Sequence, residues 1–378
     1  MSRRSASPPS SDGAGLPARP PGTGPRGRGA RGNPAGRFET RVTQREDDGW
    51  EAPDAELPDA EPPVRTQVTE ERAGRIVTRN ASPDLSFDRS VNPYRGCEHG
   101  CTYCYARSSH AYLGLSPGLD FETKLTVKPG AAAALRRELS ARGYAPATIA
   151  IGTNTDPYQP IERDRRVMRA CLEVLSEFRH PVAIVTRGAL VTRDADLLGE
   201  MGRAGLARVG LSIPTLDAAL SRSMEPRAPA PAQRLRAAER LAAAGVPVRL
   251  CLAPVIPGLT DHEVEAIVAA AARAGATAAS LAMLRLPGEV AGLFRAWLEE
   301  ARPDRAARVM ARVREVHGGR DYDATFGRRL TGQGEVARLI RRRFRLACRR
   351  HGLAERMPAL RTDLFRVPPR PGDQLALF

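Results

Sequence analysis

The sequence predicts an α/β fold, a partial (β/α)6 barrel of the TIM-like kind, and two observations lead to this prediction. From about residue 84 onward, short β-branched runs alternate with longer segments of helical periodicity. Such alternation is typical of βα units and a parallel sheet. Six such units can be counted, whereas a closed barrel of this type has eight strands. The expected architecture is therefore an incomplete barrel with helices outside the sheet.

The six expected strands follow one another along the chain. They span residues 90–95, 148–152, 182–186, 207–213, 246–255 and 278–286. Helices are expected from residue 105 and near residues 130–142, 163–179, 192–204, 230–244 and 261–274. Gly205, Gly245 and Gly275 each follow a helix, where a left-handed residue commonly ends it. Thr260 and Glu263 have the spacing of a capping box that would open the last of these helices.

Polar or Pro- and Gly-rich loops follow several of these strands. They are residues 153–160 (TNTDPYQP), 214–217 (PTLD), 254–259 (PVIPGL) and 285–287 (RLP). In α/β folds the ligand site lies at the carboxyl ends of the strands. The loops should therefore share one rim of the barrel, together with the loop that follows the first strand.

The loop after the first strand carries three cysteines, in the sequence NPYRGCEHGCTYCYAR. Cys97, Cys101 and Cys104 are spaced C-x3-C-x2-C, and thiolates favour zinc, copper(I) or iron–sulfur clusters. A cubane cluster held by three cysteines would leave one iron open to a substrate or cofactor. A zinc site would need His99 or His110 as its fourth ligand, because no second cysteine pair is present. Disulfide bonds are a weaker explanation of the three cysteines, because pairing two of them would leave the third thiol unpaired. The chain also has no recognisable secretory signal that would place it in an oxidising compartment.

The net charge of +15 and a pI near 10.5 favour a polyanionic partner, of which nucleic acid is the first candidate. A general enrichment in Ala, Arg, Gly and Pro is the alternative explanation of that charge. No run of 18 apolar residues occurs, so no membrane-spanning helix is expected.

Four regions can be separated by composition. Residues 1–66 are rich in Pro, Gly and Arg and are predicted to be disordered. The core spans residues 84–300, and residues 301–365 form a basic helical extension. In that extension, residues 338–350 (RLIRRRFRLACRR) are expected to bury a stripe of Leu339, Ile340, Phe344, Leu346 and Ala347. The arginine face of this helix either binds phosphate or is solvated.

The last region, residues 366–378, is a Pro-rich spacer followed by an apolar peptide. Its final residues, Gln374 to Phe378 (QLALF), are similar to the Q-L-x-L-F peptides by which bacterial repair proteins bind the DNA sliding clamp. The alternative is that this peptide folds back on the barrel.

Residues 84–300 resemble the radical S-adenosylmethionine (SAM) family that includes spore photoproduct lyase and uncharacterised bacterial relatives. The matching motifs are C-x3-C-x-aromatic-C with Tyr103 as the aromatic residue, GTNTDPYQPIE, EPRAP and APVIPGLTD. The stretches AYLGLSPGLDFETK and LRLPGEV point to the uncharacterised relatives. The resemblance implies the partial barrel of radical SAM enzymes.

The resemblance also implies cofactors and their ligands. Cys97, Cys101 and Cys104 would bind three irons of a 4Fe–4S cluster, and SAM would chelate the fourth. Tyr103 would lie beside the adenine, and Glu225 and Arg227 would either orient SAM or form an internal ion pair. The remaining expected SAM contacts are Asn154, Thr155, Asp156, Arg187 and Ser212.

The reaction implied is reductive cleavage of SAM to a 5′-deoxyadenosyl radical that abstracts hydrogen from a substrate, with nucleic acid repair or modification as the leading function. A flavodoxin- or ferredoxin-like reductant and a cytoplasmic location are expected. The alternatives are a radical SAM modifier of a protein or small molecule, and a non-catalytic metal-stabilised nucleic-acid-binding module. Spore photoproduct lyase uses a cysteine in the loop after its second strand as the hydrogen-atom donor. The corresponding loop here contains no cysteine, so Tyr158 and Cys251 are the candidates for a hydrogen donor.

Overall fold

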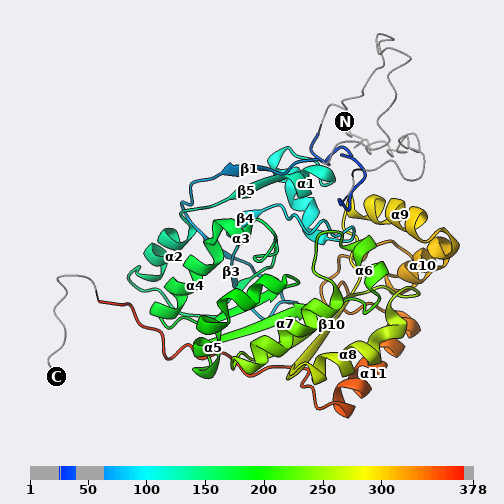
Figure 1. Cartoon of the computed structure of the whole chain (residues 1–378). Helices are drawn as coiled ribbons and strands as arrows, with labels where there is room; N and C mark the ends of the chain where they lie inside the picture. Colours follow the sequence, from blue (N-terminus) through cyan, green and yellow to red (C-terminus); the bar gives the residue numbers. More distant parts are fainter. Residues whose placement is uncertain (1–24, 26, 40–63, 370–378) are drawn as a thin grey trace, which may run out of the picture.

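The computed structural model describes residues 25, 27–39 and 64–369, and within them a curved seven-stranded sheet runs through the molecule (Figure 1). Its order is β10–β9–β8–β7–β6–β3–β2. The strands are β2 (Val77–Arg79), β3 (Arg89–Val91), β6 (Ile149–Ile151), β7 (Val182–Thr186), β8 (Ala207–Ser212), β9 (Val248–Val255) and β10 (Ala278–Met283). All neighbours pair in parallel except β2, which is antiparallel to β3. The predicted partial barrel of six parallel strands is confirmed.

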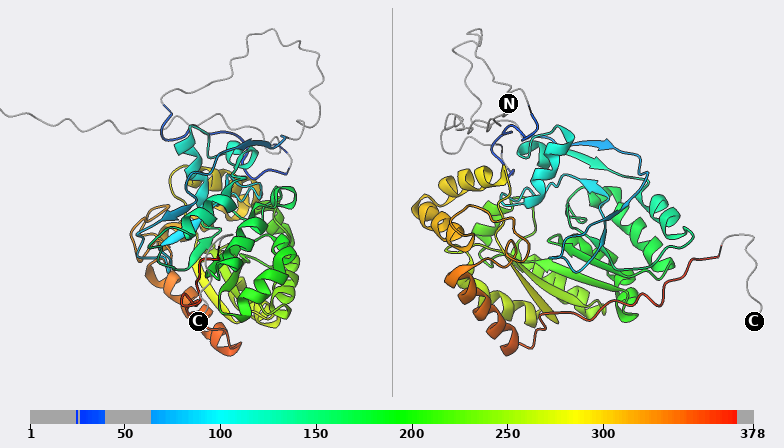
Figure 2. Two further views of the ribbon diagram at one scale, coloured as in Figure 1. Left: turned by 90° about the vertical axis from the view of Figure 1, so that its left-hand side faces the viewer. Right: turned by 180° about the vertical axis from the view of Figure 1, so that it is seen from behind.

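One layer of helices covers the outer face of the sheet, as the side and back views show (Figure 2). Each helix contacts the next in the order α2 (Ala131–Leu139), α4 (Val167–Glu177), α5 (Ala195–Arg203), α7 (Pro231–Ala243), α8 (Val264–Arg273) and α11 (Gly334–Arg350). The main apolar core lies between this layer and the sheet. The basic helix α11 also packs on β10, so it occupies the outer position that follows the last strand.

Local sequence explains most element ends but not the start of α8. Gly205, Gly245 and Gly275 have φ of 73°, 86° and 82°, as expected of residues that end helices. The predicted capping box is wrong, because a turn of 3-10 helix, η3 (Asp261–Glu263), precedes α8 and makes no side-chain cap. The carboxylate of Glu263 instead accepts hydrogen bonds from the loop after β8, namely from the Thr215 hydroxyl (2.5 Å) and the Leu216 amide (2.7 Å).

A small second sheet lies over the carboxyl edge of the barrel (Figure 1). It pairs β5 (Lys124–Val127) with β1 (Gln67–Glu70) in parallel and with β4 (Tyr94–Arg95) in antiparallel fashion. The cysteine loop, residues 96–104, leaves β4 and enters the helix η1 (Tyr105–Leu113). The remaining helices of the described residues are α1 (Leu119–Thr123), α3 (Glu162–Arg165), η2 (Ala189–Asp194), α6 (Ala218–Met224), α9 (Val290–Ala301) and α10 (Pro303–Val316). None of the helices described is long and apolar enough to cross a bilayer.

The amino edge of the barrel is crossed by residues 351–366, which we call the floor segment (Figure 1). The amide of Ala279 in β10 donates to the carbonyl of Ala354 (2.9 Å). Farther along, the amide of Arg361 donates to the carbonyl of Gly205, just before β8 (2.9 Å). The amide of Arg366 donates to the carbonyl of Phe178, which precedes β7 (3.1 Å). The floor segment therefore links strands that are far apart in the sequence.

Part of the region predicted to be disordered is ordered. Residues 27–39, the N-terminal strap, lie against the cysteine loop and α1. They are held mainly by hydrogen bonds and ion pairs, and Phe38 adds an aromatic contact with Tyr112 (ring centroids 5.0 Å apart). Arg31 pairs with Glu300 and Arg37 with Glu289 (2.8 Å). Composition cannot reveal such contacts, because the acidic partners of the strap lie between 87 and 269 residues away along the sequence. Gln374 to Phe378 lie outside the described residues, so the expected clamp peptide remains a prediction.

The basic helix α11 buries a different stripe from the one expected. Its buried residues are Ala337, Ile340, Phe344, Ala347 and Cys348, whereas Leu339 and Leu346 are 58% and 48% exposed. Three of its arginines make contacts within the protein. Arg343 pairs with Glu265 (2.6 Å), Arg338 pairs with Glu335 of the same helix, and Arg341 donates to the carbonyl of Thr331 (2.6 Å). The helix therefore docks on the barrel with only part of its arginine face free for phosphate.

His180, buried beneath the floor segment, gives a prediction of pH dependence. Its ring nitrogens lie 2.8 Å from the Tyr144 hydroxyl and 3.1 Å from the Pro181 carbonyl, which suits a neutral imidazole. Burial lowers the pKa of His180 from 6.5 to about 4. Between these pH values the unfolded chain binds the additional proton, so stability should be complete above pH 6.5 and fall as the pH drops toward 4. The loss expected at pH 5 is about 2 kcal/mol.

Urea unfolding of the native protein and His180→Gln, each at pH 7 and pH 5, measures this contribution. The pH-dependent loss should be smaller in the variant by about 2 kcal/mol, since other groups titrate equally in both. Equal losses in the two proteins would mean that His180 is not held neutral in the fold.

Candidate functional site

The cysteine loop is fixed from several elements before its thiols are considered. The side chain of Gln159, after β6, accepts a hydrogen bond from the Glu98 amide (2.8 Å) and donates one to the Gly96 carbonyl (3.2 Å). The guanidinium of Arg107, in η1, donates to the Cys101 carbonyl (2.8 Å). Because neighbouring elements hold its backbone, the loop presents its thiols in a defined arrangement.

All three thiols face one cavity, the cysteine cavity. Cys97 and Cys101 are buried, and Cys104 is partly exposed. The strand-end loops contribute Gly152, Thr153, Asn154, Thr155, Asp156, Val185, Thr186, Arg187 and Ser212 to the wall. Burial raises the pKa of the Cys101 thiol to about 12, although Arg187 opposes that rise. Metal binding must therefore displace the thiol protons.

The arrangement of donors fits a cluster better than a single metal ion. Within residues 25, 27–39 and 64–369, no three His, Cys, Asp or Glu side chains are placed to hold one ion together. The zinc alternative is further disfavoured, because neither His99 nor His110 is among the residues that line the cysteine cavity. Thiolates around one cavity suit a larger iron–sulfur group, in which each sulfur binds a different iron.

Asp156 anchors the loop after β6 to the end of β7. Its carboxylate accepts hydrogen bonds from the Thr186 hydroxyl (2.5 Å), the Arg187 amide (2.8 Å) and the Tyr158 amide (2.9 Å). It also lies 3.4 Å from Nδ1 of His99. Burial alone would raise the pKa of Asp156, but His99 and Arg187 outweigh burial and lower it. With its oxygens engaged by the protein, Asp156 is placed to shape the cavity wall.

Glu225 is the centre of a buried charged network beside the Cys101 thiol. Its carboxylate makes a close ion pair with Arg234, lies 3.4 Å from Arg187 and accepts a hydrogen bond from the Tyr103 hydroxyl. Burial would raise the pKa of Glu225, but Arg234 and Arg187 together lower it. Arg187 in turn contacts Sγ of Cys101 and lies 5.7 Å from the Tyr103 ring centroid. A cation is thereby held next to a thiol that faces the cavity.

Arg227 is the one expected SAM contact that this arrangement separates from the others. It pairs with Glu98 (3.3 Å) rather than with Glu225, and it borders a different cavity. Asn154, Thr155 and Ser212 lie in the wall of the cysteine cavity, and their contact with SAM stays a prediction.

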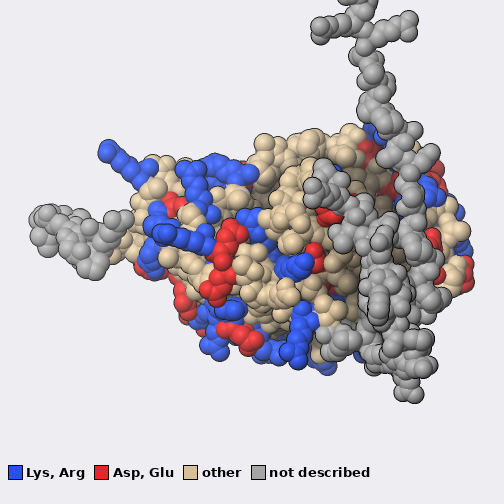
Figure 3. Space-filling view, turned by 90° about the horizontal axis from the view of Figure 1, so that it is seen from above, with Lys and Arg blue, Asp and Glu red and all other residues tan. Residues whose placement is uncertain are grey.

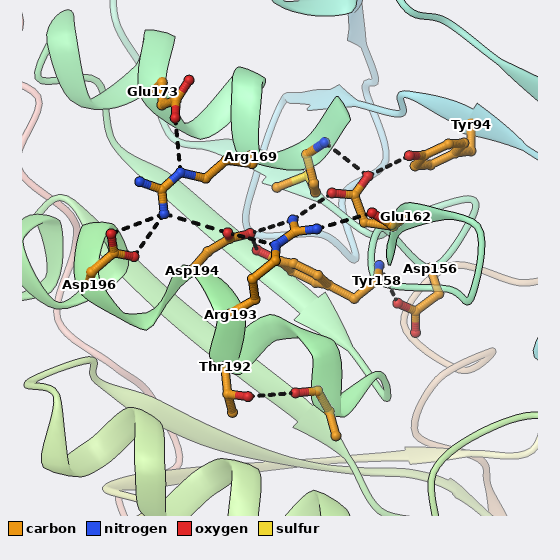
Figure 4. Close-up of polar contacts among 12 residues, drawn as sticks. Tyr94, Asp156, Tyr158, Glu162, Arg169, Glu173, Thr192, Arg193, Asp194 and Asp196 are labelled. Atoms are coloured by element: carbon orange, nitrogen blue, oxygen red, sulfur yellow. Dashed lines mark hydrogen bonds and ion pairs between the residues drawn. The ribbon is translucent and has the colours of Figure 1, made fainter. Parts of the chain in front are cut away.

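A buried polar network supports the loop after β6 from behind (Figure 4). Arg193 binds Glu162 (2.6 Å) and Asp194 (2.9 Å), and the Tyr158 hydroxyl donates to Asp194 (3.1 Å). Tyr158 is therefore turned into this network, and neither it nor Cys251 is among the residues that line the cysteine cavity.

The sequence gives no indication of the support behind the cysteine loop. The buried carboxylate of Glu122 pairs with the buried Arg107 (2.5 Å) and accepts hydrogen bonds from the amides of Gly29 (2.9 Å) and Ala30 (2.8 Å) in the N-terminal strap. Gly29 lies so close to the loop that a Cβ there would overlap the Gly100 carbonyl. The strap therefore packs directly on the cysteine loop at Gly100.

A partial (β/α)6 barrel with three thiols around one cavity at its carboxyl edge defines the radical SAM class. The model of the Radical SAM superfamily matches residues 91–271, and the chain belongs to this superfamily. It is 38% identical to an uncharacterized protein of Mycobacterium tuberculosis over 235 residues, 62% of this chain and 68% of the relative. An uncharacterized protein of Methanocaldococcus jannaschii is 28% identical over 46% of this chain and 62% of its own length.

Solved structures show the same fold in spore photoproduct lyase. The complex of that enzyme with dinucleoside spore photoproduct superposes with a TM-score of 0.56, covering 76% of this chain and 81% of the lyase, at 16% identity. A C140S mutant of the lyase gives a TM-score of 0.55 over 76% of this chain and 80% of its own, at 17% identity.

The protein is therefore an enzyme of the radical SAM type, whose cofactors are a 4Fe–4S cluster and SAM. Cys97, Cys101 and Cys104 are the residues that would hold the cluster. When bound, the cofactors supply a hydrogen-abstracting 5′-deoxyadenosyl radical. The chain itself fixes the cysteine loop, keeps the Arg187 cation beside Cys101 and excludes water by burial.

Proposed function

We propose that this enzyme acts on a nucleic acid, in repair or modification. The observation that carries the proposal is a second cavity beside the cysteine loop, the outer groove, whose wall includes His99, Arg163, Arg227, Gln233, Arg236 and Arg240. Among the described residues, Arg163, Arg236 and Arg240 form no ion pair with a carboxylate. Guanidinium groups without acidic partners are suited to bind phosphates.

The outer groove is joined to the cysteine loop through its own wall. The Arg227 amide donates to the carbonyl of His99, which lies between Cys97 and Cys101 (3.3 Å). By contrast, the view from above shows Lys and Arg side chains with acidic ones between them (Figure 3). The local arginine cluster supports a phosphate-binding role more directly than the total charge does.

A paired comparison of arginines tests the groove. The double variant Arg236→Ala/Arg240→Ala should bind DNA and RNA more weakly. The slope of log Kobs against log[salt] should also become shallower by about two units, one for each lost phosphate contact. The matched control is Arg342→Ala with Arg345→Ala, which removes two exposed arginines of α11. Should the α11 pair change the salt dependence and the groove pair leave it unaltered, the phosphate contacts would belong to α11.

Anaerobic turnover tests the substrate class. The reconstituted enzyme is reduced in the presence of SAM and of DNA or RNA whose hydrogens are isotopically labelled. The label is then sought in 5′-deoxyadenosine. Transfer from nucleic acid supports the proposal. SAM cleavage without such transfer, together with transfer from a protein or small molecule, would favour the alternative substrate class. Enzymes of this type need an electron donor, and we propose a flavodoxin- or ferredoxin-like protein for that role.

A further inference from the structure

The interior of the barrel holds a third cavity, the lumen cavity, directly behind the cysteine cavity. The two share Thr153 and Val185 in their walls. From there the lumen cavity extends toward the amino ends of β7, β8 and β9, and its far end is bordered by Met357 of the floor segment and by Phe87. A molecule in this cavity would therefore lie next to the residues that surround the thiols.

Two arginines from adjacent strands line the lumen cavity. Arg249 of β9 pairs in parallel register with Gly210 of β8, and Arg208 lies two residues before Gly210 on the same face. Gly210 leaves this part of the wall free of a side chain; a Cβ there would lie 2.8 Å from Sγ of Cys251. Both guanidinium groups can therefore share one space.

Neither arginine has an acidic partner among the described residues. Arg208 donates to the Pro358 carbonyl of the floor segment (3.1 Å), a neutral acceptor. Nε of Arg249 is buried without any hydrogen-bond partner. Burial, and then the neighbouring Arg249, lower the pKa of Arg208. Positive charge that is partly buried and has no counter-charge is unfavourable, and an anion between the two groups would remove this penalty.

We propose that Arg208 and Arg249 bind an oxyanion of the substrate, a phosphate or a carboxylate, and so orient its reacting part toward the cysteine cavity. The planar guanidinium fork matches such a group, because it can donate two parallel hydrogen bonds to its oxygens. This inference rests on the proposed function, since it assigns a substrate-binding role to the same active site. A nucleic acid would supply a backbone phosphate, and a small metabolite its own phosphate or carboxylate.

The first test uses inorganic phosphate as the probe. Phosphate should raise the melting temperature of the full-length protein above that in chloride of equal ionic strength, and the concentration dependence gives its Kd. Arg249→Met should weaken this Kd at least tenfold, whereas Arg345→Met on the exposed face of α11 should leave most of the effect. An unchanged phosphate Kd in Arg249→Met would overturn the proposal.

A second variant covers the case in which Arg249→Met does not fold. Arg249→Lys keeps the charge but loses the fork, so it should fold and bind phosphate several-fold more weakly than the native protein. Full phosphate affinity in the lysine variant would also contradict the role assigned to the guanidinium.

Further arms of the experiment separate the sources of the anion and the two proposals. A nucleoside 5′-monophosphate that binds at least tenfold more tightly than phosphate would indicate a nucleotide substrate, and equal binding would indicate a small phosphorylated one; either result supports the oxyanion site. Tighter binding of acetate than of phosphate would indicate a carboxylate substrate. Label transfer from nucleic acid tests the proposed function separately, and its failure would leave the phosphate result standing.

Discussion

Replacing any one of Cys97, Cys101 or Cys104 with Ala is expected to abolish reductive cleavage of SAM. The three thiols face one cavity from a single fixed loop, and each would bind a different iron. Removing one leaves two protein ligands, which cannot keep the cluster in place. Iron content after anaerobic reconstitution and formation of 5′-deoxyadenosine under reduction measure the effect, and both should fall to background.

The other cysteines provide matched controls. Cys171 in α4 and Cys348 in α11 are buried in the core between helices and sheet. Cys171→Ala and Cys348→Ala should retain iron and SAM cleavage, with at most a small loss of stability from packing. A Cys101→Ala protein that still cleaved SAM would contradict the assignment of the cluster ligands.

Glu122→Gln is expected to destabilise the protein strongly. Glu122 and Arg107 are both fully buried, and the glutamate also accepts the amides of Gly29 and Ala30. The substitution preserves size but leaves the Arg107 guanidinium without its counter-charge. Loss of one partner of a buried pair costs about 3–5 kcal/mol. The N-terminal strap and the cysteine loop should loosen together, and iron incorporation should fall.

The control for this prediction is an ion pair between the same strap and α9. Glu300 pairs with Arg31 near the surface, where both side chains remain partly exposed, so Glu300→Gln should cost at most about 1 kcal/mol. Urea unfolding of the two apo proteins gives the comparison. If Glu122→Gln were no more destabilising than Glu300→Gln, the buried pair would not hold the loop.

The strands and the cysteine loop could be predicted because their signals are local. Each strand is a short β-branched run between helical segments, and the three cysteines lie within eight residues of one another. The partners of charged residues could not be predicted in this way. Arg227 and Glu225 are two residues apart, yet they bind Glu98 and Arg234, respectively. Which charges meet depends on how loops from different strands converge, and residue spacing within one loop carries no information on that.

The N-terminal strap shows the same limit more strongly. Its composition is that of a flexible chain, and no apolar periodicity marks it. Its order comes from backbone amides that satisfy the buried carboxylate of Glu122, more than 90 residues further along the sequence. The order of the strap depends on a hydrogen-bond acceptor elsewhere in the fold, so it can be recognised only once the fold is known.

The floor segment has a consequence for the order in which a growing chain can fold. A ribosome synthesises residues 27–39 before the cysteine loop, so the strap's amides are available when that loop and Glu122 emerge. Residues 351–366 are synthesised after every strand of the barrel. Until they emerge, Arg208 lacks the Pro358 carbonyl, and the edges of β8 and β10 lack their contacts with Arg361 and Ala354. The barrel is therefore completed late in translation, and the amino edge of its sheet stays uncovered until the floor segment emerges.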